Sequence, residues 1–137
     1  DGSPLDTTHL FYTAKCSTNV QGGYDIRYCY ATKDKNKITL TFADGLPAYA
    51  SEFYVYIDTS SFWCDVETIY PAITKGQKKS CTIVKQKLTL DKSKYLKGDT
   101  IKGFIEMEFI ETVSVPTKAV QKRNLFLKGY FKTPLTE

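Results

Sequence analysis

The chain has 137 residues, of which 42% are hydrophobic and 25% are charged, and its formal net charge at neutral pH is +4. This length and balance predict one globular domain and disfavour a disordered chain. The small, dispersed charge disfavours a nucleic-acid binder, and no apolar run reaches the roughly 20 residues of a membrane-spanning helix. Ten tyrosines and eight phenylalanines favour strands over helices.

The N-terminus, DGSPLDTT, is polar. It lacks the basic and apolar regions of a signal peptide, so we interpret it as the trimmed start of a longer precursor. We therefore expect a flexible leader over residues 1–7 and a single β-domain over residues 8–137.

Apolar and polar residues alternate through much of the first ninety residues, which is the pattern of half-buried strands. The clearest example is KITLTFA, where three apolar residues share one face: Ile38, Leu40 and Phe42. In a second segment, four residues are expected to share a face: Tyr24, Ile26, Tyr28 and Tyr30. The predicted strands are 9–15, 24–32, 37–43, 51–59, 81–90 and, as either a strand or a short irregular segment, 61–70.

The alternation within 81–90 changes frame between Cys81/Ile83 and Leu88/Leu90. A change of frame inside one strand is the mark of an extra residue on one side of the ladder. We therefore expect a β-bulge near Lys85.

The strongest alternation lies in Thr100–Ile110 and Asn124–Leu135, which we expect to pair as a C-terminal wall joined by a polar loop. Each segment carries a glycine in line with its apolar face, Gly103 in the first and Gly129 in the second. A glycine inside a strand marks a bulge, a bend or the close approach of another backbone. The apolar face of the first segment consists of Ile101, Ile105, Met107 and Phe109.

About eight such strands, frequent turn residues and no helical periodicity predict an all-β domain. The expected architecture is an antiparallel β-sandwich or a small barrel. No low-complexity tract or domain boundary interrupts it.

Four cysteines, at positions 16, 29, 64 and 81, allow three disulfide pairings. A two-residue hairpin turn at Gly22-Gly23 would place Cys16 directly opposite Cys29. In a non-hydrogen-bonded antiparallel pair the Cα atoms lie roughly 4.5 Å apart, at the short end of the disulfide range. The turn therefore predicts a Cys16–Cys29 bridge, and elimination predicts Cys64–Cys81.

Two alternatives to disulfides are free buried thiols and a zinc site. The zinc site is disfavoured because no C-x-x-C spacing occurs and His9 is the only histidine. Two disulfides would imply an oxidising, extracytoplasmic compartment, namely the bacterial periplasm, the cell surface or the extracellular space. The absence of an N-glycosylation sequon favours a bacterial source.

Catalytic motifs are absent from the sequence: there is no G-x-S-x-G, glycine-rich phosphate loop or EF-hand pattern. A Cys-His nucleophile pair would need His9 together with a cysteine expected to be oxidised. Glu106 and Glu108 share a strand face, as the two carboxylates of a glycosidase pair would, but two carboxylates beside Lys102 are more typical of plain surface. We expect no enzyme activity, no cofactor and no metal.

Aromatic side chains held on a sheet are the candidate binding residues, because they give contact area at low entropic cost. Tyr54 and Tyr56 lie opposite the apolar face of their strand, and Phe62 and Trp63 precede Cys64. The competing interpretation is that Trp63 belongs to the core and that nearby lysines are merely solvated. The predicted partner-binding set is Tyr54, Tyr56, Phe62, Trp63, Lys75, Lys78 and Lys79.

In general layout the chain resembles the small secreted or lipid-anchored β-domains of Gram-negative bacteria, although no diagnostic motif carries the resemblance. The expected function is a non-enzymatic extracytoplasmic domain that binds a macromolecular partner, most simply a protein, as an inhibitor or immunity-type protein does. The basic loops around Lys75–Lys79 and Lys118–Arg123 also suit a contact with an anionic membrane surface. The alternative is a carrier that encloses an apolar small molecule in a calycin-like β-barrel, although the G-x-W start of lipocalins is missing.

Overall fold

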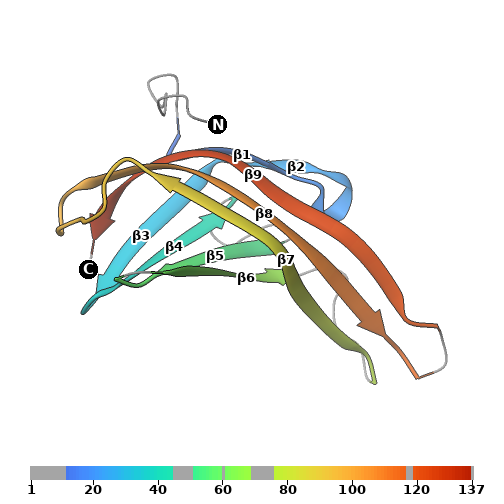
Figure 1. Cartoon of the computed structure of the whole chain (residues 1–137). Helices are drawn as coiled ribbons and strands as arrows, with labels where there is room; N and C mark the ends of the chain where they lie inside the picture. The colour runs from blue at the N-terminus through green and yellow to red at the C-terminus, as the bar shows by residue number, and fades with distance from the viewer. Residues whose placement is uncertain (1–11, 45–50, 60, 69–75, 117–118, 137) are drawn as a thin grey trace.

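The computed structural model describes residues 12–44, 51–59, 61–68, 76–116 and 119–136. Over these ranges the chain forms nine strands and one short 3-10 helix, with no α-helix, so the all-β prediction is confirmed (Figure 1). The elements are β1 Ala14–Thr18, η1 Val20–Gly22, β2 Tyr24–Ile26, β3 Tyr28–Asp34, β4 Lys37–Ala43, β5 Ser51–Ile57, β6 Phe62–Thr68, β7 Lys78–Leu90, β8 Thr100–Ser114 and β9 Gln121–Thr136.

The nine strands form a single open mixed sheet in the order β2-β1-β9-β3-β4-β5-β6, with β8 along the other edge of β9 and β7 outside β8. β9 is long enough to pair with three other strands. Most of it, from Gln121 to Pro134, pairs with β8. On its other edge Leu127–Phe131 pairs with β1 and Leu135–Thr136 pairs with β3. The β3–β9 pair is parallel, so the expectation of a purely antiparallel sheet was wrong. The choice between a sandwich and a small barrel stays a prediction.

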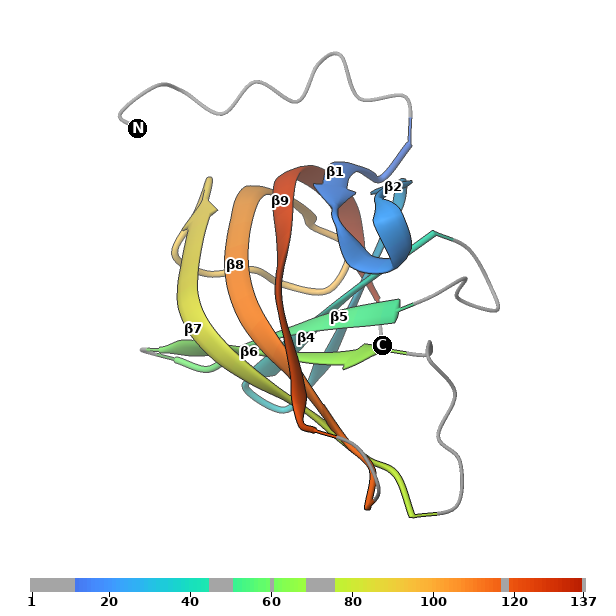
Figure 2. The same ribbon diagram turned by 90° about the vertical axis from the view of Figure 1, so that its right-hand side faces the viewer.

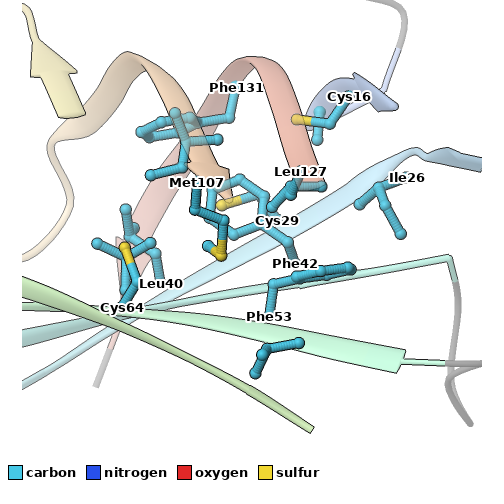
Figure 3. Close-up of a cluster of buried hydrophobic side chains, with 14 of the residues drawn as sticks. Cys16, Ile26, Cys29, Leu40, Phe42, Phe53, Cys64, Met107, Leu127 and Phe131 are labelled. Atoms are coloured by element: carbon cyan, nitrogen blue, oxygen red, sulfur yellow. The ribbon is translucent and has the colours of Figure 1, made fainter. Parts of the chain in front are cut away.

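The sheet bends so that β7, β8 and β9 arch over β3–β6, and the two layers enclose the core (Figures 1 and 2). The predicted C-terminal wall is confirmed: β8 and β9 pair antiparallel from Thr100↔Pro134 to Val113↔Gln121. Aromatic rings from the two layers meet edge to face, with centroids 5.3 Å apart for Phe42 and Phe131. Each large apolar side chain buried here stabilises the fold by about 1.5–3 kcal/mol (Figure 3).

The two strand glycines mark close approaches, as expected. A methyl group at Gly103 would lie 2.5 Å from the ring of Phe131. At Gly129 it would overlap the Lys15 carbonyl oxygen and lie 2.5 Å from Cα of Cys16. The pairing of β1 with β9 therefore requires a residue without a side chain at this point.

The turn after β1 differs from the predicted Gly22-Gly23 hairpin. The helix η1 occupies Val20–Gly22, and the Gly23 N–H donates to the Val20 carbonyl at 3.0 Å. As a result the β1–β2 register places Cys16 opposite Ile26 rather than Cys29.

The two predicted disulfides are wrong, since all four cysteines lie within the described ranges and are free thiols. The Cys16–Cys29 pair fails because of the register just described. The Cys64–Cys81 pair fails because the β7 residue that lies against Cys64 is Gln86, five positions further along the strand than Cys81. The argument for an oxidising compartment therefore loses its structural support.

Two further predictions concern strand continuity. The bulge near Lys85 is confirmed, because the β7–β8 register shifts between Ile83 and Lys85. The predicted strand 24–32 is instead interrupted at Arg27, so that Ile26 is buried whereas Tyr30 faces solvent. Among the described residues there is no helix of the length and hydropathy needed to cross a bilayer.

Candidate binding surface

The outer side of β3–β6 carries a group of aromatic side chains that face solvent. The register aligns Thr39, Tyr56 and Trp63 in one row across β4, β5 and β6. The next row aligns Tyr30, Thr41, Tyr54 and Asp65. We call this surface the aromatic face and define it by Tyr28, Tyr30, Tyr54, Tyr56 and Trp63.

The rings of the aromatic face form two stacks. Tyr54 and Tyr56 are stacked with centroids 6.2 Å apart, and Trp63 lies 5.5 Å from Tyr56 at an interplanar angle of 30°. Tyr28 and Tyr30 form the second stack, with centroids 6.4 Å apart. Threonines of β4 separate the stacks. Neighbouring rings limit the rotamers of each side chain, so the surface is largely preorganised for contact.

Two members are among the most exposed large hydrophobic side chains of the described chain: Trp63 is 41% exposed and Tyr30 is 38% exposed. Trp63 therefore lies outside the core. An exposed cluster of Tyr and Trp on a rigid scaffold has the composition of binding hot spots.

Charges flank the stack at both ends. The Lys37 ammonium lies 4.6 Å from the centroid of the Tyr56 ring and 5.5 Å from that of Trp63, within cation–π range. At the other end burial, helped by the nearby carboxylates of Glu52 and Glu67, raises the pKa of Tyr54 to about 12. The Tyr54 hydroxyl therefore keeps its proton at alkaline pH values where an ordinary tyrosine ionises.

The structure brings together only part of the predicted site. Tyr54, Tyr56 and Trp63 lie on one surface, whereas Phe62 packs against the core on the opposite side of β6. Lys75, together with His9 and Lys118, lies outside the described residues.

The two remaining predicted lysines are remote from the aromatic face. Lys78 pairs with Ser114 and Lys79 with Val113 at the far end of the β7–β8 ladder. Eight positions of β7, or roughly 25 Å of extended strand, separate Lys78 from Gln86, which is the residue beside β6. Lys78 and Lys79 therefore do not form a cationic rim around Tyr54 and Tyr56.

Sequence reasoning missed Tyr28, Tyr30 and Lys37. The two tyrosines were expected on the same face as Ile26, because nothing in the local pattern marks the interruption at Arg27. Lys37 holds an outward position at the start of β4, a placement that the alternation of its strand already implies.

The aromatic face carries no group arranged for catalysis. Among the described residues, no set of three or more His, Cys, Asp and Glu side chains is placed to hold a metal ion. The arrangement is one of broad contact. No family model, curated protein or solved structure matches the chain, so functional inference depends on this geometry.

Proposed function

We propose that the domain is a non-enzymatic binding module that recognises a protein partner through the aromatic face. The observation that carries the proposal is the preorganised stack of Tyr54, Tyr56 and Trp63 on an open, solvent-facing sheet surface. Tyr and Trp are enriched in protein interfaces, where truncating a central residue costs about 2 kcal/mol or more.

The polar groups around the stack suit a protein surface with donors and acceptors of its own. Lys37 offers a cation, and Asp65 and Glu67 offer exposed carboxylates on the neighbouring strand. Such a polar rim around an aromatic centre is the usual anatomy of a transient interface.

Trp63 supplies a direct test, because it is the only tryptophan of the chain and lies on the proposed site. Its fluorescence reports on this surface alone. A bound partner should shift its emission to the blue and protect it from quenching by iodide. Candidate partners, purified from fractions that the immobilised domain retains, are titrated against this signal.

A matched pair of variants makes the test specific. Tyr54→Ala with Tyr56→Ala should weaken binding more than roughly tenfold while the circular dichroism spectrum is unchanged. Phe104→Ala with Tyr130→Ala, a pair from the other layer, should leave the affinity within about twofold. The proposal fails if both pairs weaken binding equally, or if a partner binds without protecting Trp63.

The second candidate is the small-molecule carrier. A hollow of about 320 Å³ is lined by four aliphatic side chains (Ile38, Ile57, Leu90 and Leu96), by Tyr95, and by polar or charged side chains (Lys33, Asn36, Asp58, Thr59, Ser93 and Lys94). This favours at most a small apolar ligand, because the space between the layers is filled by pairs such as Phe53 and Phe109, whose centroids are 6.0 Å apart. If the domain takes up an apolar fluorescent probe, and if Leu90→Arg abolishes this uptake, the carrier is supported over the protein-binding module.

A further inference from the structure

The outer side of the other layer is strongly basic. Strand alternation directs six lysines outward around the middle of this layer, on β7, β8, β9 and β1, and two more, Lys78 and Lys122, at its far end. The only acidic side chains that these strands direct outward are Glu106 and Glu108, so the six central lysines and the two carboxylates have a net charge of +4. We call this surface the basic face and define its lysines as Lys15, Lys85, Lys87, Lys102, Lys128 and Lys132.

Most of these charges are not neutralised by the protein. Lys85 alone compensates the two carboxylates, at 3.2 Å from Glu106 and 3.5 Å from Glu108. The other five lysines form no ion pair within the part of the chain that the structure describes. Like charges on one surface repel one another, and an external anion that binds there reduces this repulsion.

Two aromatic rings lie in the middle of the basic face. Phe104 and Tyr130 are adjacent across β8 and β9, and their rings meet edge to face with centroids 4.9 Å apart. Lys102 and Lys132 lie on one side of this pair, and Lys128 lies on the other. An apolar ring with a polar tip, surrounded by long cationic side chains, has the composition of a membrane-interface contact.

A hollow of about 440 Å³ adjoins this surface at its β1 side. Three basic side chains (Lys15, Arg27 and Lys128) and one acidic side chain (Asp25) line it, together with the apolar Ala14 and Ile26, so its charged lining is net basic and part of it is apolar. A lipid matches this lining, because its anionic headgroup suits the basic side chains and its acyl chain suits the apolar part.

The shape and charge of the molecule favour a lipid surface over a soluble polyanion. In Figure 1, β7, β8 and β9 arch with their convex side away from β3–β6. The middle of a convex sheet is the part that reaches a plane first, and here the middle carries Phe104 and Tyr130, whereas a polymer is usually held in a groove. The opposite layer carries exposed carboxylates, among them Asp65 and Glu67, which an anionic membrane repels.

We propose that the basic face docks the domain on a membrane that contains anionic phospholipids. The lysines contact the lipid phosphates, Phe104 and Tyr130 lie at headgroup level, and the aromatic face points away from the bilayer. The proposal does not depend on the identity, or the existence, of a protein partner.

Co-sedimentation with phosphatidylcholine vesicles, with and without phosphatidylglycerol, tests the proposal. The full chain should bind only the anionic vesicles, and binding should weaken as salt is raised. Each lysine near an anionic surface contributes roughly a factor of five to binding, so Lys87→Gln with Lys128→Gln should weaken binding about 25-fold. The charge-matched control, Lys35→Asn with Lys94→Gln, should change binding less than threefold.

Competition experiments separate the lipid surface from other anions. Inorganic phosphate, compared with chloride at equal ionic strength, should not displace the protein from vesicles. Dextran sulfate that binds more tightly than the vesicles, with the same dependence on Lys87 and Lys128, would overturn the proposal in favour of a polymer site. Equal binding to both kinds of vesicle, or equal losses in the two double variants, would also overturn it.

Discussion

Gln86 of β7 and Cys64 of β6 are joined across the gap between two edge strands, where the Cys64 N–H donates to the Gln86 Oε1 at 3.0 Å. The Gln86 amide also donates from Nε2 to the Phe62 carbonyl at 3.4 Å. One side-chain amide thus contacts two alternate residues of β6, as a paired peptide would. It links the two ends of the bent sheet, where no β6–β7 ladder forms among the described residues.

Asn19 makes the same kind of contact at another edge. Beyond the end of β1 its Nδ2 donates to the Asn124 carbonyl at 3.1 Å, and its Oδ1 accepts from the Phe126 N–H at 2.9 Å. Both amides satisfy strand-edge groups that would otherwise be free to pair with another chain.

Replacing Gln86 with leucine should therefore destabilise the fold by about 1–2 kcal/mol, because the Cys64 N–H loses its partner in a partly buried position. Urea unfolding gives the size of the effect, and hydrogen exchange should show faster exchange at the Cys64 amide. Gln121→Ala removes an exposed amide from β9 and should change stability by less than about 0.5 kcal/mol. Equal losses in the two variants would show that the bridge contributes nothing.

Strand alternation was predictable from the sequence, because each strand's own residues determine which of its faces is apolar. Ile38, Leu40 and Phe42 were assigned inward on that basis, and all three are buried. The bulge near Lys85 was predictable for the same local reason.

Register and continuity depended on distant contacts, and there the predictions failed. The β1–β2 turn contains Asn19, which is held by β9 more than a hundred positions away. The interruption at Arg27 accompanies an ion pair with Asp44 at 3.2 Å and a position 5.6 Å from the Tyr12 ring. Neither contact can be inferred from the neighbours of the residue in sequence.

For the candidate site too, the placements that depend on local strand alternation were predictable, and those that depend on distant contacts were not. Tyr54 and Tyr56 were predicted on one outward face from their own strand, and they do lie there. The lysines were added because they are near in sequence. Lys78 and Lys79 instead stand at the first positions of β7 and pair with the end of β8. β7 reaches β6 only at Gln86, so its first residues lie far from the aromatic face.

Thiol labelling should separate one cysteine from the other three. Burial raises the pKa of Cys16 and of Cys64 to about 12, and it raises that of Cys29 well above its ordinary value. Only the thiolate reacts, so these three should resist labelling in the native protein, whereas the partly exposed Cys81 should react. With a disulfide reagent, we expect one thiol to react rapidly in the native protein and four thiols to react after denaturation. Cys81→Ser should abolish the fast phase, and a fast phase that survives this change would contradict the burial.

The same thiols should make the fold sensitive to alkaline pH. An unfolded cysteine ionises near pH 9, but buried Cys16 keeps its proton up to about pH 12. Above pH 9 the native state therefore binds more protons than the unfolded state, and stability falls with rising pH by up to roughly 1.4 kcal/mol per unit for each such thiol. Below pH 9 the contribution of the neutral thiols is fully present.

Urea midpoints measured from neutral pH to pH 10 test this slope. An unfolded tyrosine, whose ordinary pKa is 10, also ionises towards the top of this range, so the share of the thiols is measured by comparison with a cysteine variant. Cys16→Ala with Cys29→Ala should lower stability at neutral pH but flatten the decline above pH 9. A decline as steep in the double variant as in the parent would assign the alkaline sensitivity to other groups.

The buried carboxylate of Glu111 should make the chain depend on Arg123. The Glu111 side chain is 0% exposed, and Arg123, 43% exposed, donates from Nε to its Oε1 at 3.0 Å. Arg123→Ala should cost about 3 kcal/mol, because it leaves a desolvated charge without this partner. Glu111→Gln should cost less, since the freed guanidinium can turn to water. With the charge gone, the double variant should be no less stable than Glu111→Gln alone.

A double-mutant cycle by urea unfolding measures this coupling, and Arg27 supplies the matched control. Arg27 pairs with Asp44 at 3.2 Å, but both side chains are solvated, at 47% and 24% exposure. An ion pair of that kind contributes at most about 1 kcal/mol, so Arg27→Ala should be the milder of the two arginine variants. The asymmetry arises from solvation, since the geometry of the two pairs is similar. If the two arginine variants lose the same stability, Glu111 is hydrated in solution and its pairing with Arg123 is no stronger than a surface contact.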